Sequence, residues 1–522
     1  MKPSPEDRLC LVTGATGYVG GRLVPLLLEA GYAVRCMTRS AASLRDQPWI
    51  DQVELVEADA ADPAATAAAL DGVDTAYYLI HSMLGGARFE EADRVAARTF
   101  AEQARRARIG RLVYLGGLAP EGGPLSAHMR SRAEVGRILL ESGVPTVVLR
   151  AAVIIGSGSA SFEMLRYLAE RLPVMVTPRW VDSLVQPIAV RDVLRYLAAA
   201  AALPEQVHGA FDIGGPEVLT YRQMMKHYAD IAGLAPRHIL PVPVLTPQLS
   251  SHWVGLVTPI PSALARPLIE SLRHDAVCRD RAGIARVIPD PPGGLVGFED
   301  AVDLALRRVR EAAVVTRWSS GSVPGAPSDP LPTDPSWAGG SLYTDLRERA
   351  TPASPAAVWR AIEAIGGETG WYSLPVAWQA RGLIDRAFGG VGLRRGRRDP
   401  VRLRVGDAVD FWRVEELLPG RMLRLRAEMR LPGLAWLELG VRPAREGGAL
   451  YRQRAVFHPR GLAGQLYWWS IKPFHGLVFG AMARNLTRRA METGPAASAA
   501  AAAAARDRGK PVPPRLRSHA EI

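Results

Sequence analysis

Three glycines spaced three residues apart near the N-terminus are the residues of this chain best suited to bind phosphate. They are Gly14, Gly17 and Gly20, between an apolar run at residues 9–12 and a helical pattern at residues 22–29. In such a strand-to-helix turn, the first glycine permits the turn, the second lets the backbone approach a pyrophosphate, and the third lets helix and strand pack closely. The helix N-terminus would then bind the phosphates of a dinucleotide; a glycine-rich turn without a ligand is the alternative. We expect dinucleotide contacts at Gly14, Thr16, Gly17, Tyr18, Val19 and Gly20.

The end of the second strand-like segment, residues 33–37, indicates which dinucleotide would bind. In folds of this kind, an acidic residue at that strand end binds the ribose 2′-hydroxyl, whereas an arginine accommodates a 2′-phosphate. Here Thr38 and Arg39 follow the strand, with no Asp or Glu beside them. The sequence therefore predicts NADP (as NADPH) in preference to NAD, unless Arg39 is only a solvated charge. After the third strand-like segment, Asp59 and Ala60 are placed to contact the adenine.

Strand-like and helical segments continue to alternate after this point. Residues 75–80 form a fourth apolar run that ends at His81, and a helical stretch at residues 90–108 leads to a fifth run at residues 111–115. A further helical pattern, around residues 128–140, precedes the run at residues 146–150. This alternation predicts an α/β fold with a doubly wound parallel sheet.

Several motifs occur in an order that resembles a known superfamily. They are TGATGYVG, YYLIHSM, LVYLGGL, LRAAVIIGSGSASFE, QPIAVRDV and FDIGGPE. Together they resemble the extended and atypical short-chain dehydrogenase/reductase (SDR) superfamily, with the YbjT-like and NmrA-like NAD(P)-binding branch closest, over about residues 8–310. The resemblance implies a Rossmann domain at residues 7–316, with a substrate-side part after about residue 151. It also implies cofactor contacts at Ile80, His81, Arg132 and Ala152.

The catalytic residues typical of the SDR family are missing from this sequence. Typical members use a Tyr and a Lys four residues later, with a Ser at the end of the fifth strand, but no lysine occurs between Lys2 and Lys226, and the fifth strand ends in Gly116-Gly117. In the matching helix, His128 and Arg132 keep the four-residue spacing and so share one helical face.

These substitutions suggest a different set of catalytic groups. His128 could transfer a proton near its ordinary pKa of about 6.5, and Arg132 could hold ribose hydroxyls as a fixed cation. His81, at a strand tip, would face the nicotinamide. We name His128, Arg132 and His81 as candidate catalytic residues; ordinary polar residues near a cofactor are the alternative.

The composition excludes several classes of partner. The formal net charge is +12, but 60 of the 64 basic residues are arginines spread along the chain, without interleaved aromatics or a nucleic-acid motif. We therefore expect no nucleic-acid partner. Cys10, Cys36 and Cys278 have neither disulfide nor metal-ligand spacing, so we expect no metal site and a reducing compartment. With no signal peptide or clean transmembrane span, we expect a cytoplasmic protein.

A second domain follows a linker at residues 317–337, which is rich in Pro, Ser, Gly and Asp. Ser354-Pro355 opens a helix, strand-like runs follow at 401–405, 408–415, 422–429, 435–441 and 450–457, and a last helix is expected from Pro473 to about Met491. This order resembles the SRPBCC superfamily, an α+β helix-grip (START-like) fold, over about residues 341–491, and the domain is expected to span residues 338–495. Such folds often enclose an apolar cavity; a packed domain without one is the alternative. Residues 496–522 are predicted to be disordered.

The most aromatic stretch of the chain lies at residues 466–474, from Leu466 to Phe474. It could sit at a membrane interface, which would place the protein peripherally at the inner face of the membrane. A helix that closes a sheet needs the same apolar residues, and this is the alternative.

The sequence as a whole predicts an NADP-dependent oxidoreductase of atypical SDR type that acts on a small apolar molecule without the usual Tyr-Lys pair. The alternative is an NAD(P)H-sensing binding protein without turnover. The oligomeric state cannot be predicted from these features.

Overall fold

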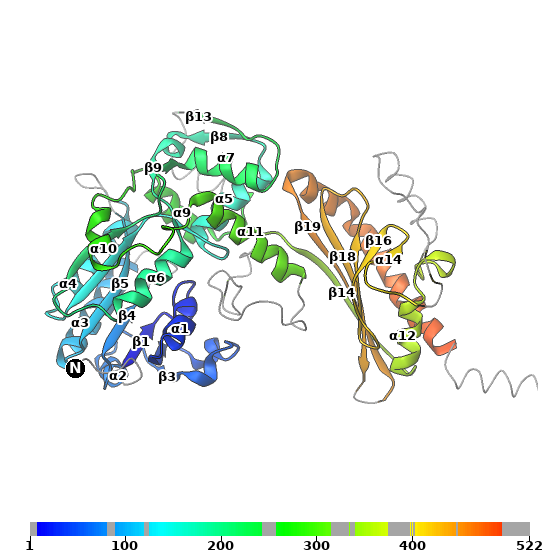
Figure 1. The fold of residues 1–522 in the computed structure, drawn as a ribbon, viewed down its shortest axis with the longest axis horizontal. Coiled ribbons are helices and arrows are strands. Elements are labelled where there is room, and N and C mark those ends of the chain that lie inside the picture. The colour runs from blue at the N-terminus through cyan, green and yellow to red at the C-terminus, as the bar shows by residue number, and fades with distance from the viewer. Residues whose placement is uncertain are drawn as a thin grey trace, which may run out of the picture. The chain divides into compact units, whose positions relative to one another are not determined.

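The chain divides into two compact units, residues Met1–Ser341 and Leu342–Ile522, which we call unit 1 and unit 2. The computed structural model describes residues 8–80, 89–118, 125–242, 257–314, 334, 340–373, 397, 399, 402–444 and 447–492 (Figure 1). The expected linker at residues 317–337 therefore lies outside the described residues apart from Asp334, and the expected tail at residues 496–522 lies wholly outside them.

Unit 1 is built on a seven-stranded sheet in the order β11-β6-β5-β4-β1-β2-β3. All neighbouring strands are parallel, and the order runs outward from β1 in both directions, which confirms the doubly wound α/β prediction. The strands are β1 (Leu9–Thr13), β2 (Ala33–Thr38), β3 (Glu54–Glu57), β4 (Thr75–Tyr78), β5 (Arg111–Gly117), β6 (Thr146–Ala151) and β11 (Gly209–Ile213).

Helices cover both faces of this sheet, which explains why the strands are apolar on both sides. In β1, Cys10 and Val12 pack with α1 and α6, whereas Leu11 packs on the opposite face with α2, α3 and α4. The helices are α1 (Gly20–Glu29), α2 (Pro63–Leu70), α3 (Phe89–Arg106), α4 (Ala127–Leu140) and α6 (Val190–Ala200). Because all these strands are parallel, their carboxyl ends meet at one edge of the sheet.

The chain after β6 forms a second layer of unit 1 with a hydrophobic core of its own, in which Phe162, Met224 and Tyr228 are buried. The helices of this layer are α5 (Ala160–Arg171), α7 (Tyr221–Ile231), α9 (Ser262–Ser271) and α11 (Phe298–Val314), whereas α10 (Arg281–Val287) packs on β11 and joins the core of the seven-stranded sheet. The short strands are β7 (Ile154–Ile155), β8 (Val174–Pro178), β9 (Leu184–Val185), β10 (Ile188–Ala189), β12 (Leu219–Thr220) and β13 (His238–Val242).

Unit 2 contains a six-stranded antiparallel sheet in the order β14-β19-β18-β17-β16-β15, with α12 and α14 packed on it and on each other. Figure 1 shows both helices beside this sheet. The strands are β14 (Tyr343–Thr351), β15 (Ala408–Val409), β16 (Trp412–Leu418), β17 (Met422–Ala427), β18 (Gly433–Pro443) and β19 (Ala449–Pro459). The helices are α12 (Pro355–Glu363) and α14 (Gly461–Glu492).

Two local predictions for unit 2 are wrong. Residues 402–405 form no strand, and the last helix begins at Gly461, twelve residues before the expected start at Pro473. Proline lacks the N–H that an interior helical position donates, but α14 continues through Pro473. Trp468 on one side of Pro473 and Phe479 on the other are both buried, so packing holds the two halves of the helix in one element.

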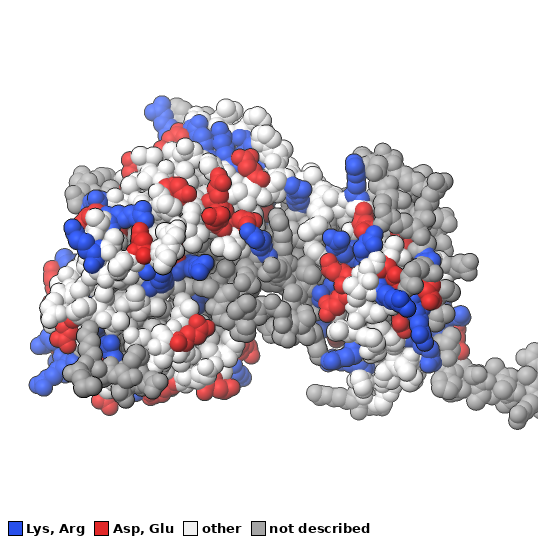
Figure 2. Space-filling model, in the orientation of Figure 1, with Lys and Arg blue, Asp and Glu red and all other residues white. Residues whose placement is uncertain are grey.

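The surface carries mixed charge on the face that Figure 2 shows, where acidic side chains lie among the lysines and arginines of both units. No helix in the described part of the chain combines the length and the hydropathy that crossing a bilayer requires.

Candidate functional site

The loop between β1 and α1 is held against the end of β4. Gly14 has a φ of +68°, and a Cβ there would meet the Leu79 carbonyl oxygen at 2.6 Å. The Thr13 hydroxyl donates to the Tyr77 carbonyl and accepts from the Leu79 N–H, at 3.0 and 2.9 Å. A Cβ at Gly20 would overlap the Gly14 carbonyl oxygen. The first and third glycines therefore have the steric roles that their spacing predicts.

Gly17 lies at the exposed tip of the same loop. Its N–H donates to the Gly14 carbonyl at 2.9 Å, and the only atom near a Cβ built at Gly17 is that same carbonyl oxygen, at 3.2 Å. The space above this backbone is therefore open, at the start of a ten-residue helix whose N-cap is Val19. The geometry fits a dinucleotide: Gly17 offers close backbone approach, and the first turn of α1 supplies N–H groups to a pyrophosphate.

The residues predicted to hold the adenosine end lie at the adjacent strand ends. The Thr38 carbonyl accepts from the Ala58 N–H at 2.8 Å, which joins the ends of β2 and β3. Arg39 follows β2 and is exposed. Asp59 is also exposed, and its Oδ1 accepts from the Ala61 N–H at 2.9 Å, so this side chain shapes the turn after β3. Ala60 is buried beside it.

The residues predicted to contact the nicotinamide end come from β4, β5 and β6. Ile80 follows β4, and Ala152 follows β6 at the same edge of the sheet. The Arg132 side chain reaches the end of β5: its Nη1 donates to the Leu115 carbonyl at 3.4 Å, and its Cδ is 3.4 Å from a Cβ built on Gly117. His81 lies outside the described residues, so its place in the site stays a prediction.

His128 lies in the first turn of α4, after the N-cap Ser126, and only 8% of its surface is exposed. Burial, and next the positive charge of Arg132, lower the pKa of His128 to about 3. The expectation that His128 titrates near its ordinary pKa is therefore wrong, because packing around α4 buries the ring beside Arg132. At neutral pH the ring is uncharged, so it can donate a hydrogen bond but does not carry an extra proton.

This lowered pKa makes stability depend on pH through His128. Because the folded pKa lies below the unfolded value of about 6.5, the unfolded chain binds the proton first, and stability is lost as pH falls from about 6.5 toward 3. Between about pH 7 and pH 5, we expect the free energy of unfolding to fall by about 2 kcal/mol more in the native protein than in His128→Asn. Urea unfolding of both proteins at both pH values measures this difference, and parallel pH profiles would contradict the burial of a neutral His128.

The Tyr18 ring joins the glycine loop to the second layer of unit 1. A Cβ on Gly158 would lie 3.1 Å from the Tyr18 ring, and burial raises the pKa of the Tyr18 hydroxyl above its ordinary value. The Gly158 N–H donates to Glu163 Oε1 at 2.9 Å, and Glu163 forms a fully buried ion pair with Arg166 at 3.1 Å. The loop at residues 156–159 is therefore held in place beside the expected cofactor site.

An ion pair that the sequence does not reveal lies at the same place. Arg22, in the first turn of α1, donates through Nη1 and Nη2 to the two carboxylate oxygens of Asp334, at 2.9 and 2.6 Å. Both side chains are buried, and the Arg22 guanidinium lies 4.2 Å from the centroid of the Tyr18 ring. The two partners are 312 residues apart, so no local pattern could have predicted their contact.

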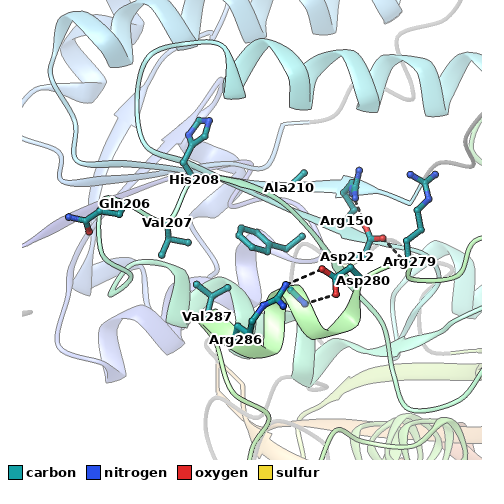
Figure 3. A pocket seen from close by; sticks show the side chains of 12 residues that line it. Arg150, Gln206, Val207, His208, Ala210, Asp212, Arg279, Asp280, Arg286 and Val287 are labelled. Carbon is teal, nitrogen blue, oxygen red and sulfur yellow. Dashed lines mark hydrogen bonds and ion pairs between the residues drawn. The ribbon is translucent and has the colours of Figure 1, made fainter.

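A separate hollow of about 410 Å³ lies along the edge strand β11 and helix α10 (Figure 3). Its charged side chains are largely paired: Asp212 accepts from Arg150 Nε at 2.7 Å and from the Arg279 N–H at 3.0 Å, and Asp280 pairs with Arg286 at 3.2 Å. Three strands, β6, β5 and β4, separate β11 from β1 in the sheet, so this hollow lies away from the glycine loop. No group of three or more metal-ligating side chains occurs in the described ranges.

Comparison with known families assigns a cofactor class to unit 1. A family model described as NAD(P)H-binding matches residues 14–151 and so includes the glycine loop, Arg39 and Arg132. A model described as a protein of unknown function (DUF2867) matches residues 337–482. With the sheet order above, the first match shows that unit 1 contains an NAD(P)-binding Rossmann-type domain. The prediction of an NAD(P)-binding Rossmann domain is therefore confirmed.

Similar characterised proteins include reductases and dehydrogenases. A ceramide reductase of Caulobacter vibrioides is 29% identical over 305 residues, which cover 56% of this chain and 92% of that protein. A 3 beta-hydroxysteroid dehydrogenase/Delta 5-->4-isomerase of Mycobacterium tuberculosis is 39% identical over 93 residues, or 17% of this chain and 24% of that protein.

Similar solved structures have low sequence identity to this chain. The triphenylmethane reductase of a Citrobacter species, complexed with NADP(H), is 16% identical, with a TM-score of 0.46 and coverage of 57% of this chain and 99% of that one. The enzyme WbmH of Bordetella bronchiseptica, in complex with NAD+, is 16% identical, with a TM-score of 0.43 and coverage of 58% and 98%.

Proposed function

We propose that this protein is an NADPH-dependent oxidoreductase of atypical SDR type that acts on a small, largely apolar molecule. The observation that carries the proposal is the open backbone at Gly17, between β1 and α1, with Arg39 at the end of β2 and Arg132 at the end of β5. A pyrophosphate site needs the packed Gly14 and Gly20 to shape the loop and the exposed Gly17 to admit the phosphates. A turn that binds no ligand does not need an open glycine at this position.

Each part of the cofactor would be held by residues of unit 1. The loop from Gly14 to Gly20 would bind the pyrophosphate, Arg39 the 2′-phosphate, and Arg132 the nicotinamide ribose, as a fixed cation. The bound cofactor supplies a hydride. His128, neutral above its low pKa, would orient a polar substrate atom by donating a hydrogen bond, and His81, which the sequence alone predicts near the nicotinamide, is the second candidate.

Two features support an apolar substrate. The relatives described above are named for ceramide and for a 3β-hydroxysteroid, and both are lipids. Unit 2 combines an antiparallel sheet with a long C-terminal helix, which is the element order of a helix-grip (START-like) fold, and we propose that identity for it. Such a unit would bind or present the substrate. A cytoplasmic location is part of this proposal.

The preference for NADPH depends on Arg39. Replacing Arg39 with alanine is expected to weaken NADPH binding by about 10- to 100-fold, because a charge-assisted contact with the 2′-phosphate is lost. NADH, which lacks that phosphate, should bind as before. Calorimetric titration of both cofactors measures the two affinities.

Arg45→Ala is the matched control for Arg39→Ala, because Arg45 is also exposed and lies six residues away without following a sheet strand. Equal losses in the two variants would show a general effect of surface charge. An unchanged NADPH affinity in Arg39→Ala would overturn the proposed contact.

A binding protein that senses NAD(P)H without turnover is the second candidate, favoured by the missing Tyr-Lys pair and by Gly117 in place of a hydroxyl. Native mass spectrometry of the purified full chain, followed by release of its small molecules, is the first experiment. NADP(H) with a defined apolar compound supports the enzyme, and that compound then serves as substrate. His128→Asn and Arg132→Leu should lower its turnover at saturating NADPH, whereas a sensor has no turnover to lose.

A further inference from the structure

The outward face of helix α14 carries a continuous row of exposed apolar side chains. Their spacing of three to five residues places them on one side of the helix. Each is between 39% and 65% exposed, although large apolar side chains of this kind are usually buried. We call this row the α14 stripe; it consists of Leu462, Leu466, Trp469, Phe474 and Leu477.

The opposite side of α14 is fixed to the rest of unit 2. Trp468 is 5% exposed, and its ring stacks on Tyr343 at 4.9 Å and on Phe457 at 6.0 Å between centroids. Further along, Phe479 and Leu486 belong to the main hydrophobic core. The helix is therefore held along its length, and the packing that buries Trp468 turns the adjacent Trp469 outward. The aromatic stretch at residues 466–474, for which membrane contact and closure of the sheet were the two alternatives, is thus divided between surface and core.

The charges near the α14 stripe are mostly positive. No acidic residue occurs between Gly461 and Met491, and Arg460 directly precedes the helix. The Lys472 Nζ lies 4.9 Å from the centroid of the Trp469 ring, so a cation lies at the edge of the stripe. Asp345 on β14 is the acidic group paired near the helix, 3.9 Å from His475; it is 16% exposed and also forms an ion pair with Arg347.

We propose that the α14 stripe binds the surface of a phospholipid bilayer that contains anionic lipids. Trp469 and Phe474 would enter the region between headgroups and acyl chains, where aromatic rings are favoured, and Lys472 would reach the lipid phosphates. An exposed apolar row with a cation at its edge matches that surface better than it matches a protein partner, which would have to bring acidic groups of its own. The proposal does not depend on the cofactor or the reaction of unit 1.

Flotation of the full-length protein with vesicles tests this proposal. We expect the native protein to float with vesicles of phosphatidylcholine containing about 30% phosphatidylglycerol, and to bind pure phosphatidylcholine about tenfold more weakly, because Lys472 and Arg460 then lose their anionic partners. The double variant Trp469→Ser/Phe474→Ser should reduce partitioning into the anionic vesicles by about 100-fold.

Leu346→Ser is the matched control for that variant. Leu346 is 52% exposed in the same unit, but Tyr343 and Asp345 on β14 contact α14, so strand alternation directs Leu346 to the other face of the sheet. Leu346→Ser should partition into the anionic vesicles as strongly as the native protein does. Circular dichroism should show that all variants are folded.

Three results would overturn the proposal. The first is native protein that floats with neither vesicle. The second is equal partitioning of the double variant and Leu346→Ser. The third is a native dimer in light scattering that Trp469→Ser/Phe474→Ser converts to a monomer without any lipid binding, because the stripe would then be covered by a second copy of the chain.

Discussion

Replacing Gly17 with aspartate is expected to weaken NADPH binding by at least about 100-fold while unit 1 stays folded. A carboxylate at this position would lie about 5 Å from a bound pyrophosphate, and at an effective dielectric constant of about 20 the repulsion is about 3 kcal/mol per phosphate charge. The backbone can accept the side chain, because Gly17 is exposed and only the Gly14 carbonyl oxygen lies near its Cβ position. Fluorescence titration with NADPH measures the loss.

Gly17→Asn distinguishes the effect of the negative charge from the effect of the added side-chain volume at this position. Asparagine has nearly the same size as aspartate without the negative charge, so it should retain most of the affinity that aspartate removes. Gly20→Ala should behave differently from both, since its Cβ would overlap the Gly14 carbonyl and disturb the packing of α1 on β1. Unchanged binding in a folded Gly17→Asp protein would remove the phosphate site from this loop.

The features of unit 1 that the sequence predicts well are determined by residues that lie close together in the sequence. The glycine loop occupies seven residues, and both the apolar strand before it and the helix after it lie within one short segment, so local spacing determines the geometry. The doubly wound sheet follows from the repeated alternation of such segments, since parallel strands need helical crossovers. Within α4, the four-residue spacing places Arg132 on the same helical face as His128, and in the structure its side chain contacts the end of β5.

The features that the sequence does not predict depend on tertiary packing. The ion pair of Arg22 with Asp334 joins segments that share no pattern. The pKa of His128 falls because the fold buries its ring, and sequence spacing says nothing about depth. In unit 2, Pro473 suggests a helix start, but the packing of Trp468 and Phe479 extends α14 through it. Predictions from neighbouring residues therefore fail where tertiary packing determines which side chains are buried.

Replacing Arg424 with leucine is expected to have the largest effect on the stability of unit 2, about 3–5 kcal/mol. Arg424 on β17 is 3% exposed and joins Glu416 on β16, at 2.6 Å, to Glu438 on β18, at 3.1 Å. Its neighbours Leu423 and Leu425 face the hydrophobic core, so Arg424 occupies the opposite face of the sheet. Without Arg424, Glu416 loses its close partner and the buried Glu438 keeps only the 3.5 Å contact with Arg454, so negative charge stays in low dielectric with less compensation, and this sets the size of the loss.

Arg426→Leu is the matched control, because Arg426 lies on the same strand and face of β17 but is exposed, with a loose 3.8 Å contact to Glu415. Exposed pairs contribute about 0–1 kcal/mol, so this variant should be close to native. Hydrogen exchange of the β17 and β18 peptides in the full chain reports the local free energy of opening, and at least about 150-fold faster exchange is expected for Arg424→Leu alone. Similar exchange in the two variants would contradict the argument, because Arg424 is buried with two close ion pairs, whereas Arg426 is exposed with one loose contact.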